Sequence, residues 1–344
     1  MSDASFSSFQ DILVPKKSSL LLRLITLVVL AMVCGISFSI VFLKQFNIGH
    51  VTMVTLFPNV QVSEKPCPRP DLEDWEVPYV HFPKPVTYSR AECACHPVRY
   101  FAIISMQRSG SGWFETLLNS HMNVSSNGEI FSKARRANVS IITETLDKLY
   151  NLDWMSSSAK NECTSAVGLK WMLNQGLLEY HEDIVKYFSQ KGVSIIFLFR
   201  RNLLCQMVSK LANIFDHDNK LLNGTHKSHV HSPHEAQILA SYKPYLNATT
   251  MIRELKLFRN MVAKALNYFN SIRHITLYYE DIINNQTKLL DVQDFLRVPR
   301  MNLTSRQVKI HKGPLSQQVA NWDEVERTLN GTEFESFLHD DYRL

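Results

Sequence analysis

A short run of hydroxyl and glycine residues has the composition of a binding site for a phosphate-like anion. Residues 107–112 read Gln-Arg-Ser-Gly-Ser-Gly, between an apolar stretch at 100–106 and an amphipathic stretch at 113–122. A glycine turn presents successive backbone N–H groups, and a helix that begins there adds the positive end of its dipole. Arg108 precedes Gly110 and no lysine follows Gly112, so this is not the G-x-x-x-x-G-K-[ST] loop of NTPases. We therefore expect an anion bound without the lysine-and-magnesium scheme.

An arginine and a serine later in the chain could hold a further anionic group. The apolar residues 193–199 predict a buried strand, which Arg200, Arg201 and Asn202 follow. Ser209 lies two turns into the next expected helix. Read alone, Arg201 and Ser209 are more typical of a solvated strand end and an ordinary helical serine.

Taken together, the two segments resemble the sulfotransferase family, whose members use 3′-phosphoadenosine 5′-phosphosulfate (PAPS). The resemblance depends on the runs at 107–111 and 199–209 and spans about residues 100–325. In the family the first loop holds the 5′-phosphosulfate, and an Arg-Asn start with a later Ser holds the 3′-phosphate. The resemblance thus implies that Arg201 and Ser209 bind the 3′-phosphate. It assigns the phosphosulfate to Arg108, Ser109, Gly110, Ser111, Gly112 and Trp113.

Two further segments fit the family. Residues 310–322 are similar to its R-K-G loop followed by a tryptophan, which implies donor binding by Lys312 and Gly313. His311 stands where the family has arginine, and the gap to Trp322 is longer than in the cytosolic enzymes. The Tyr-Glu-Asp run at 279–281 also fits and is interpreted as structural.

The resemblance implies a general base, because the acceptor hydroxyl must lose a proton as the sulfuryl group moves. Glu129 follows the first helix, twenty-one residues after Arg108, in an Asn-Gly-Glu-Ile-Phe context. Tyrosylprotein and trehalose-type sulfotransferases place a catalytic glutamate there. We therefore predict Glu129 and Arg108 as catalytic residues. His121 is the rival, since cytosolic members use a histidine, although its position on an apolar helix face favours a packed side chain.

Lys170 lies in an otherwise apolar segment at 166–172, predicted to be a strand. A buried lysine needs a partner, so Lys170 could meet the leaving phosphate or an anionic acceptor, or else lie exposed at a strand end. The scheme requires no metal, because Arg108 and oriented backbone amides can stabilise charge on the bridging oxygen.

A polar segment at 216–235 interrupts the pattern. It carries His217, His226, His229, His231 and His234. A metal site is one reading, but no cysteine or carboxylate cluster completes it. A mobile loop beside the site, acting as a substrate lid, is the alternative that we favour.

The acceptor is predicted from the kind of sulfotransferase that the chain resembles. The nodulation-protein-H and trehalose types are closer than the cytosolic phenol type, which implies a hydroxyl on a glycan or glycolipid. A protein tyrosine is the alternative acceptor. A P-loop nucleotide kinase or NTPase would share the fold, and an inactive sugar-binding relative also stays open. The net charge of +5 is no nucleic-acid signature, and a homodimer is left open.

The N-terminal region predicts a membrane anchor. Residues 24–43 carry no charge, a length sufficient to cross a hydrocarbon core. Lys16, Lys17 and Arg23 precede the run, which favours a cytosolic tail at 1–19 and an uncleaved type II signal anchor at 20–44 over a cleaved signal peptide. The rest would then be a luminal glycoprotein of the Golgi. Seven N-x-[ST] acceptors agree, at Asn123, Asn138, Asn223, Asn247, Asn285, Asn302 and Asn330.

Composition divides the rest of the chain into two parts. Residues 45–97 hold eight of the thirteen prolines and predict a luminal stem before a sulfotransferase domain at 98–344. Five cysteines follow the anchor, and an oxidising compartment favours disulfides over a metal site at Cys93 and Cys95. Cys205 lies in an apolar helical pattern and is expected to be a buried thiol.

The predicted fold is α/β, a parallel sheet sandwiched by helices as in P-loop NTPases, with an N-terminal transmembrane helix. Apolar strand patterns alternate with helical ones, which indicates a parallel sheet covered on both faces. We expect strands at 100–106, 166–172, 193–199 and 275–279. We expect helices at 113–122, 176–190, 202–215, 250–269 and 288–296.

Overall fold

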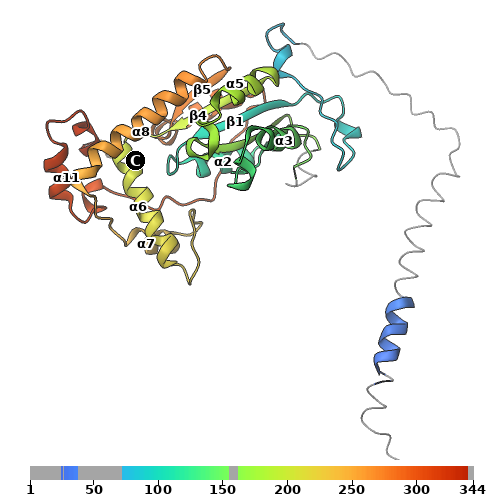
Figure 1. Cartoon of the computed structure of the whole chain (residues 1–344), viewed down its shortest axis with the longest axis horizontal. Helices are drawn as coiled ribbons and strands as arrows, with labels where there is room; N and C mark the ends of the chain where they lie inside the picture. Colours follow the sequence, from blue (N-terminus) through green and yellow to red (C-terminus); the bar gives the residue numbers. More distant parts are fainter. Residues whose placement is uncertain (1–24, 26, 38–71, 155–161, 340–344) are drawn as a thin grey trace, which may run out of the picture. The chain divides into compact units, whose positions relative to one another are not determined.

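The computed structural model describes residues 25, 27–37, 72–154 and 162–339 (Figure 1). The chain divides into two compact units, Met1–Pro66 and Cys67–Leu344. In the first unit, residue 25 and residues 27–37 are helical. The predicted tail at 1–19 and much of the predicted anchor at 20–44 lie outside the described residues. Within the described ranges, no helix combines the length and apolar character needed to cross a membrane.

A five-stranded, all-parallel sheet forms the centre of the second unit, in the order β2-β3-β1-β4-β5. The strands are β1 Arg99–Ser105, β2 Val124–Ser126, β3 Ala166–Met172, β4 Val193–Phe199 and β5 His274–Tyr278. The predictions for β3 and β4 match these bounds, and those for β1 and β5 differ by one residue. The short strand β2 was not predicted. Its Ser126 backbone is held by the Asn119 side chain in both directions, a tertiary contact without a periodic signal.

Helices cover both faces of the sheet. Side chains alternate along each strand, so each face contributes to a different apolar core. Tyr100, Ala102 and Ile104 of β1 join one apolar core, whereas Phe101 and Ile103 join the other. The first core includes side chains of the helices at 139–150, 181–190, 203–219 and 248–268, and the second those of the helices at 111–120 and 287–295. The structure thus confirms the predicted parallel sheet between helical layers.

The helices of the described part are α2 Ser111–Ser120, α3 Val139–Tyr150, α5 His181–Gln190, α6 Leu203–Asn219, α7 Pro233–Ala240, α8 Ala248–Tyr268, α9 Tyr279–Asn284, α10 Thr287–Phe295 and α11 Trp322–Leu329. Among them, α2, α5, α6, α8 and α10 correspond to predicted helices, whereas α3, α7, α9 and α11 were not predicted. The helix expected at 176–190 begins only at His181, because Gly176, with a φ of 82°, has non-helical backbone inside the turn Leu173–Leu177 that precedes α5. The helix expected at 113–122 ends at Ser120, so Met122 lies beyond it and is 73% exposed.

Part of the predicted stem packs against the sheet unit. The compact unit begins at Cys67, inside the segment 45–97. Glu76 is buried and binds Arg99 of β1 (3.3 Å) and Arg297 (3.0 Å). A disulfide joins Cys93 to Cys163. Residues 72–97 therefore belong structurally to the sheet unit, and the disulfide agrees with the expectation that these cysteines form covalent links.

The sheet order fixes where a site can form. β1 lies between β3 and β4, and the chain passes to opposite sides of β1 to reach them. In open parallel sheets, ligands bind beyond the carboxyl ends of the strands where the order reverses in this way. The loop after β1 is the Ser/Gly run that enters α2.

Candidate active site

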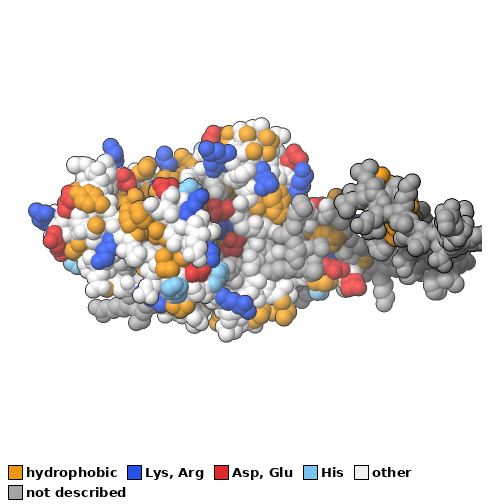
Figure 2. Space-filling model, turned by 90° about the horizontal axis from the view of Figure 1, so that it is seen from below, with side chains coloured by type: hydrophobic (Ala, Val, Ile, Leu, Met, Phe, Trp, Pro, Cys, Tyr) orange, Lys and Arg blue, Asp and Glu red, His pale blue; other side chains and the backbone are white. Residues whose placement is uncertain are grey.

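A cavity of about 460 Å³ opens at the carboxyl ends of β1, β3 and β4. Its described lining carries many cations and a single carboxylate, that of Glu129. The lysines and arginines among the lining residues are Arg108, Lys170, Arg200, Lys210 and Lys309. On the face drawn in Figure 2, by comparison, acidic and basic side chains are interspersed. The excess of positive charge in this cavity suits an anionic ligand.

The two glycines of the Ser/Gly loop pack directly against the side chains of Tyr279 and His229. Gly110 has a φ of 79°, a conformation that favours glycine. A Cβ on Gly110 would lie 2.7 Å from Cε2 of Tyr279 and closer still to Cδ2, and a Cβ on Gly112 would meet the imidazole of His229. Backbone at these two positions can thus approach a ligand that side chains would exclude. This cradle and the surrounding cations fit the phosphosulfate of a donor such as PAPS.

Most of the residues assigned to the phosphosulfate line the cavity. They are Arg108, Gly110, Ser111, Gly112 and Trp113. Ser109 is fully buried beneath them, and its hydroxyl has no hydrogen-bond partner among the described residues.

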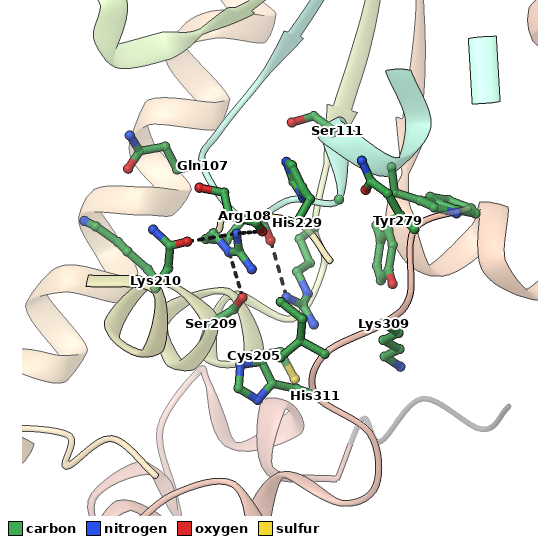
Figure 3. Close-up of a pocket in the computed structure, with 18 of the residues that line it drawn as sticks. Gln107, Arg108, Ser111, Cys205, Ser209, Lys210, His229, Tyr279, Lys309 and His311 are labelled. Carbon is green, nitrogen blue, oxygen red and sulfur yellow. Dashed lines mark hydrogen bonds between the residues drawn. The ribbon is translucent and has the colours of Figure 1, made fainter. Parts of the chain in front are cut away.

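Arg108 lies at the centre of this arrangement, with its guanidinium turned toward α6 (Figure 3). Its Nε donates a hydrogen bond to Ser209 Oγ at 2.9 Å, and its Nη1 donates to Asn213 Oδ1 (3.2 Å) and to the carbonyl of Ser228 (2.9 Å). Burial and the nearby charge of Arg200 lower the pKa of Arg108 to about 10. Arg108 and Ser209, predicted to contact different groups of the donor, therefore lie together.

The two arginines after β4 point to different places. Arg201 is exposed, pairs with Asp281 at 2.5 Å, and stacks over the Tyr278 ring at 4.1 Å. It is not among the cavity-lining residues, whereas Arg200 is, and Nη1 of Arg200 donates to the carbonyl of Arg108 (3.4 Å). The structure therefore places Arg200, and not Arg201, in the cavity that Ser209 also lines. Alternation past the strand end puts adjacent side chains on opposite sides, but the sequence does not say which enters the site.

The C-terminal segment adds cations from the other wall. His311 and Gly313 line the cavity, together with Lys309, whereas Lys312 is exposed and is not among the lining residues. Burial, then Arg108 and Arg200, lowers the pKa of His311 to about 4. Burial and Arg200 also lower the pKa of Lys309. Cations this close together repel one another, so a bound anion would stabilise this part of the cavity.

The Glu129 side of the cavity contains a buried charge network. Lys170 Nζ lies 3.4 Å from Glu129 Oε1 and 3.1 Å from Glu115 Oε2. Gln175 Nε2 donates to Glu129 Oε2 at 2.8 Å. Lys170 is 7% exposed, so its partners are these carboxylates, in line with the rule that a buried lysine is paired. Glu115 was missed, although a carboxylate on the apolar face of α2 is a signal for a buried partner.

His121 lies away from the cavity and is held by backbone groups. Its Nδ1 accepts from the N–H of Asn123 (3.0 Å), which leaves Nε2–H to donate to the carbonyl of Pro299 (2.8 Å). It is 1% exposed and does not line the cavity. These contacts match the packed histidine and not the acceptor contact.

The histidine-rich segment forms a wall of the cavity. Val230 pairs with Val308 in an antiparallel bridge, and Leu222, Val230, Ala236 and Leu239 form a small apolar core. The segment was expected to be a loop, but α6 extends through Asn219 and α7 begins at Pro233. Across the described residues, no group of three or more His, Cys, Asp or Glu side chains is placed to hold a metal ion.

One comparison with a known protein agrees with the sequence resemblance. No family model matches the chain. Nodulation protein H of Rhizobium meliloti is 24% identical over 241 residues, which cover 67% of this chain and 90% of that protein. This similarity supports the resemblance to the sulfotransferase family.

Two solved structures were also found. The sulfotransferase domain from the curacin biosynthetic pathway is 14% identical, with a TM-score of 0.31, over 65% of this chain and 82% of that one. A sulfotransferase from Alicyclobacillus acidocaldarius is 12% identical, with a TM-score of 0.35, over 70% and 96%. TM-scores this low assign no role to any residue of this chain.

Proposed function

We propose that the chain is a PAPS-dependent sulfotransferase that uses Glu129 as general base and a carbohydrate hydroxyl as acceptor. The observation that carries this proposal is the composition of one cavity. Arg108 and the glycine loop line it together with Arg200 and Lys309, and Glu129 is the carboxylate on its described lining. The similarity to Nodulation protein H supports the same activity.

In this proposal, Glu129 acts on the acceptor and Arg108 acts on the donor. Glu129 would take the proton of the acceptor hydroxyl while that oxygen bonds to sulfur and the bond from sulfur to the donor phosphate breaks. Arg108 and the N–H groups at the start of α2 would offset the negative charge that grows on the departing phosphate. Lys170 would hold Glu129 on the acceptor side, as its 3.4 Å contact indicates.

The geometry favours a revised set of residues for the second phosphate of the donor. Arg200 and Lys309 line the same cavity as Ser209, whereas Arg201 and Lys312 do not line it. His311 lies beside these cations, as the charges that act on its pKa show. We propose that Arg200 and Lys309 contribute to the 3′-phosphate site in place of Arg201 and Lys312.

The acceptor and the compartment complete the proposal. A glycan or glycolipid hydroxyl is preferred, and a protein tyrosine is the second candidate, because the spacing from Arg108 to Glu129 also suits tyrosylprotein enzymes. The Cys93–Cys163 disulfide supports an oxidising compartment. The uncharged run at 24–43 supports a single-pass type II anchor, and the sequons support a luminal, glycosylated domain of a Golgi enzyme.

The test is transfer from radiolabelled PAPS to a panel of glycans and peptides by the full-length chain. We expect a glycan to be labelled, and E129Q to lower kcat by about a hundredfold, within the range for loss of a general base. E144Q is the matched control, since Glu144 forms an exposed pair with Lys148 on α3. Full transfer by E129Q would remove Glu129 as the base. Labelled peptides alone would favour tyrosine, and consumption of ATP without labelling would favour a kinase.

A further inference from the structure

A buried carboxylate outside every motif lies behind the proposed base. Glu115 is on α2, about one turn after Ser111, and its side chain is 10% exposed. Its neighbours Phe114, Leu117 and Leu118 are almost fully buried apolar residues of the same helix. A buried charge is unfavourable unless it is paired and hydrogen-bonded, so its partners indicate what it does.

The partners of Glu115 fix the backbone next to Glu129. Its Oε1 accepts hydrogen bonds from the N–H of Gly128 (2.8 Å) and from Ser126 Oγ (2.6 Å). The carbonyl of Gly128 in turn accepts from the N–H of Lys170 at 3.0 Å. Gly128, which has a φ of 71°, is thus held on both sides immediately before Glu129.

Glu115 also shares the ammonium group that contacts Glu129. Lys170 Nζ lies closer to Glu115 (3.1 Å) than to Glu129 (3.4 Å). The Glu129 side chain is the more exposed of the two carboxylates, at 39% against 10%. Glu115 therefore keeps Lys170 in place and offsets part of its charge, while Glu129 stays accessible at the cavity wall.

We propose that Glu115 is a positioning residue for Glu129, acting through Lys170 and Gly128; this inference rests on the proposed function. The same helix carries the donor loop at its start and Glu115 one turn later. A single rigid element thereby sets the phosphosulfate cradle and the base relative to each other. Rate is sensitive to such placement, because a misplacement of about 1 Å can cost about a hundredfold.

The test is a double-mutant cycle with the full-length chain, using E115Q, E129Q and the double variant. Glutamine keeps an oxygen that can accept from Gly128 but removes the charge that holds Lys170. We expect E115Q to lower kcat by about 10- to 100-fold. The KM for PAPS, and the calorimetric Kd for its product 3′-phosphoadenosine 5′-phosphate (PAP), should change by less than about twofold, because donor contacts are untouched. In the E129Q background, E115Q should cost less than about twofold, since its effect passes through Glu129.

The outcomes separate the two proposals. If the wild type labels no acceptor from PAPS, the proposed function fails and this inference fails with it. If the wild type is active, three results overturn the inference alone: unchanged kcat in E115Q, losses that multiply in the double variant, or a parallel loss of PAP binding. E144Q again serves as the control for removing a paired glutamate. Should E115Q not fold, S126A removes one hydrogen bond to Glu115, and it should lower kcat several-fold with an unchanged KM for PAPS.

Discussion

Gly110→Ala should damage the donor loop more than its size suggests. Two separate costs act at this position. The φ of 79° is unfavourable for alanine, and the new Cβ would lie 2.7 Å from Cε2 of Tyr279. Non-bonded carbon atoms prefer separations of about 3.5–4.0 Å, so the loop or the ring must move by about 1 Å.

The ring has little room to move away. Tyr279 packs edge-on against Trp113, with ring centroids 5.8 Å apart, and the Arg200 guanidinium lies 5.5 Å from the Tyr279 ring centroid. The left-handed conformation costs a non-glycine residue about 1–2 kcal/mol, and overpacking adds about 1–3 kcal/mol. We therefore expect G110A to lower the free energy of unfolding by about 2–5 kcal/mol, the sum of these two terms. Displacement of Tyr279 would also disturb Arg200 and weaken PAP binding.

The assay compares G110A with G331A in the full-length chain. Gly331 has a φ of 72°, and nothing lies within 4 Å of a Cβ placed there, so G331A carries only the conformational cost. Denaturant unfolding should show G110A less stable than G331A by about 1–3 kcal/mol. Calorimetry should show PAP binding weakened by about tenfold or more in G110A alone, as expected for a loop shifted by about 1 Å.

Two results would refute this reasoning. Equal loss of stability in the two variants would show that the contact with Tyr279 costs nothing. Normal PAP affinity in a destabilised G110A would show that the loop does not hold the donor.

Three further predictions concern the cavity walls. G112A should weaken PAP binding because its Cβ meets the His229 imidazole, and H229A should restore part of the affinity by making room; no rescue would place the defect elsewhere. R200A should weaken PAP binding by about tenfold or more. R201A, which loses an exposed pair with Asp281, should change PAP binding by less than about twofold. If R201A weakened binding more than R200A did, the second phosphate would be assigned to Arg201 again. Because the His311 pKa is about 4 in the fold and 6.5 ordinarily, the unfolded chain binds that proton first as pH falls. The free energy of unfolding should therefore decrease from about pH 6.5 to pH 4, less steeply in H311Q.

The sheet could be read from the sequence because each long strand is buried on both faces. The runs at 166–172 and 193–199 are continuous and apolar, and the structure gives β3 and β4 these bounds. β2 has three residues and is held by Asn119 from a neighbouring helix, so no local pattern marks it. The packing of residues 72–97 against the sheet could not be predicted for a similar reason. The many prolines indicate a stem, whereas the contact of Glu76 with Arg99 of β1 has no local pattern in the sequence.

The site was predictable where it depends on backbone and less so where it depends on side-chain direction. The glycine loop is a local feature, and its place after β1 follows from the sheet. Arg200 and Arg201 are adjacent and alike, so only the contacts of Glu280 and Asp281 in the fold decide which one turns away. Glu115 of α2 and Lys170 of β3 form an ion pair between two elements that are far apart in the sequence, so their spacing along the chain does not predict it.

The crowding of positive charge has a consequence for stability and binding together. Arg108, Lys309 and His311 all have lowered pKa values, with burial as the first cause and neighbouring cations as the next. A cavity arranged in this way is a source of instability until an anion enters it. A ligand that binds only the folded state adds RT ln(1 + [L]/Kd) to stability, and relief of the repulsion among the cations is one of the contributions that lower its Kd. At one fixed concentration, PAP should therefore raise the thermal midpoint of the wild type more than that of R200A, because R200A binds PAP more weakly.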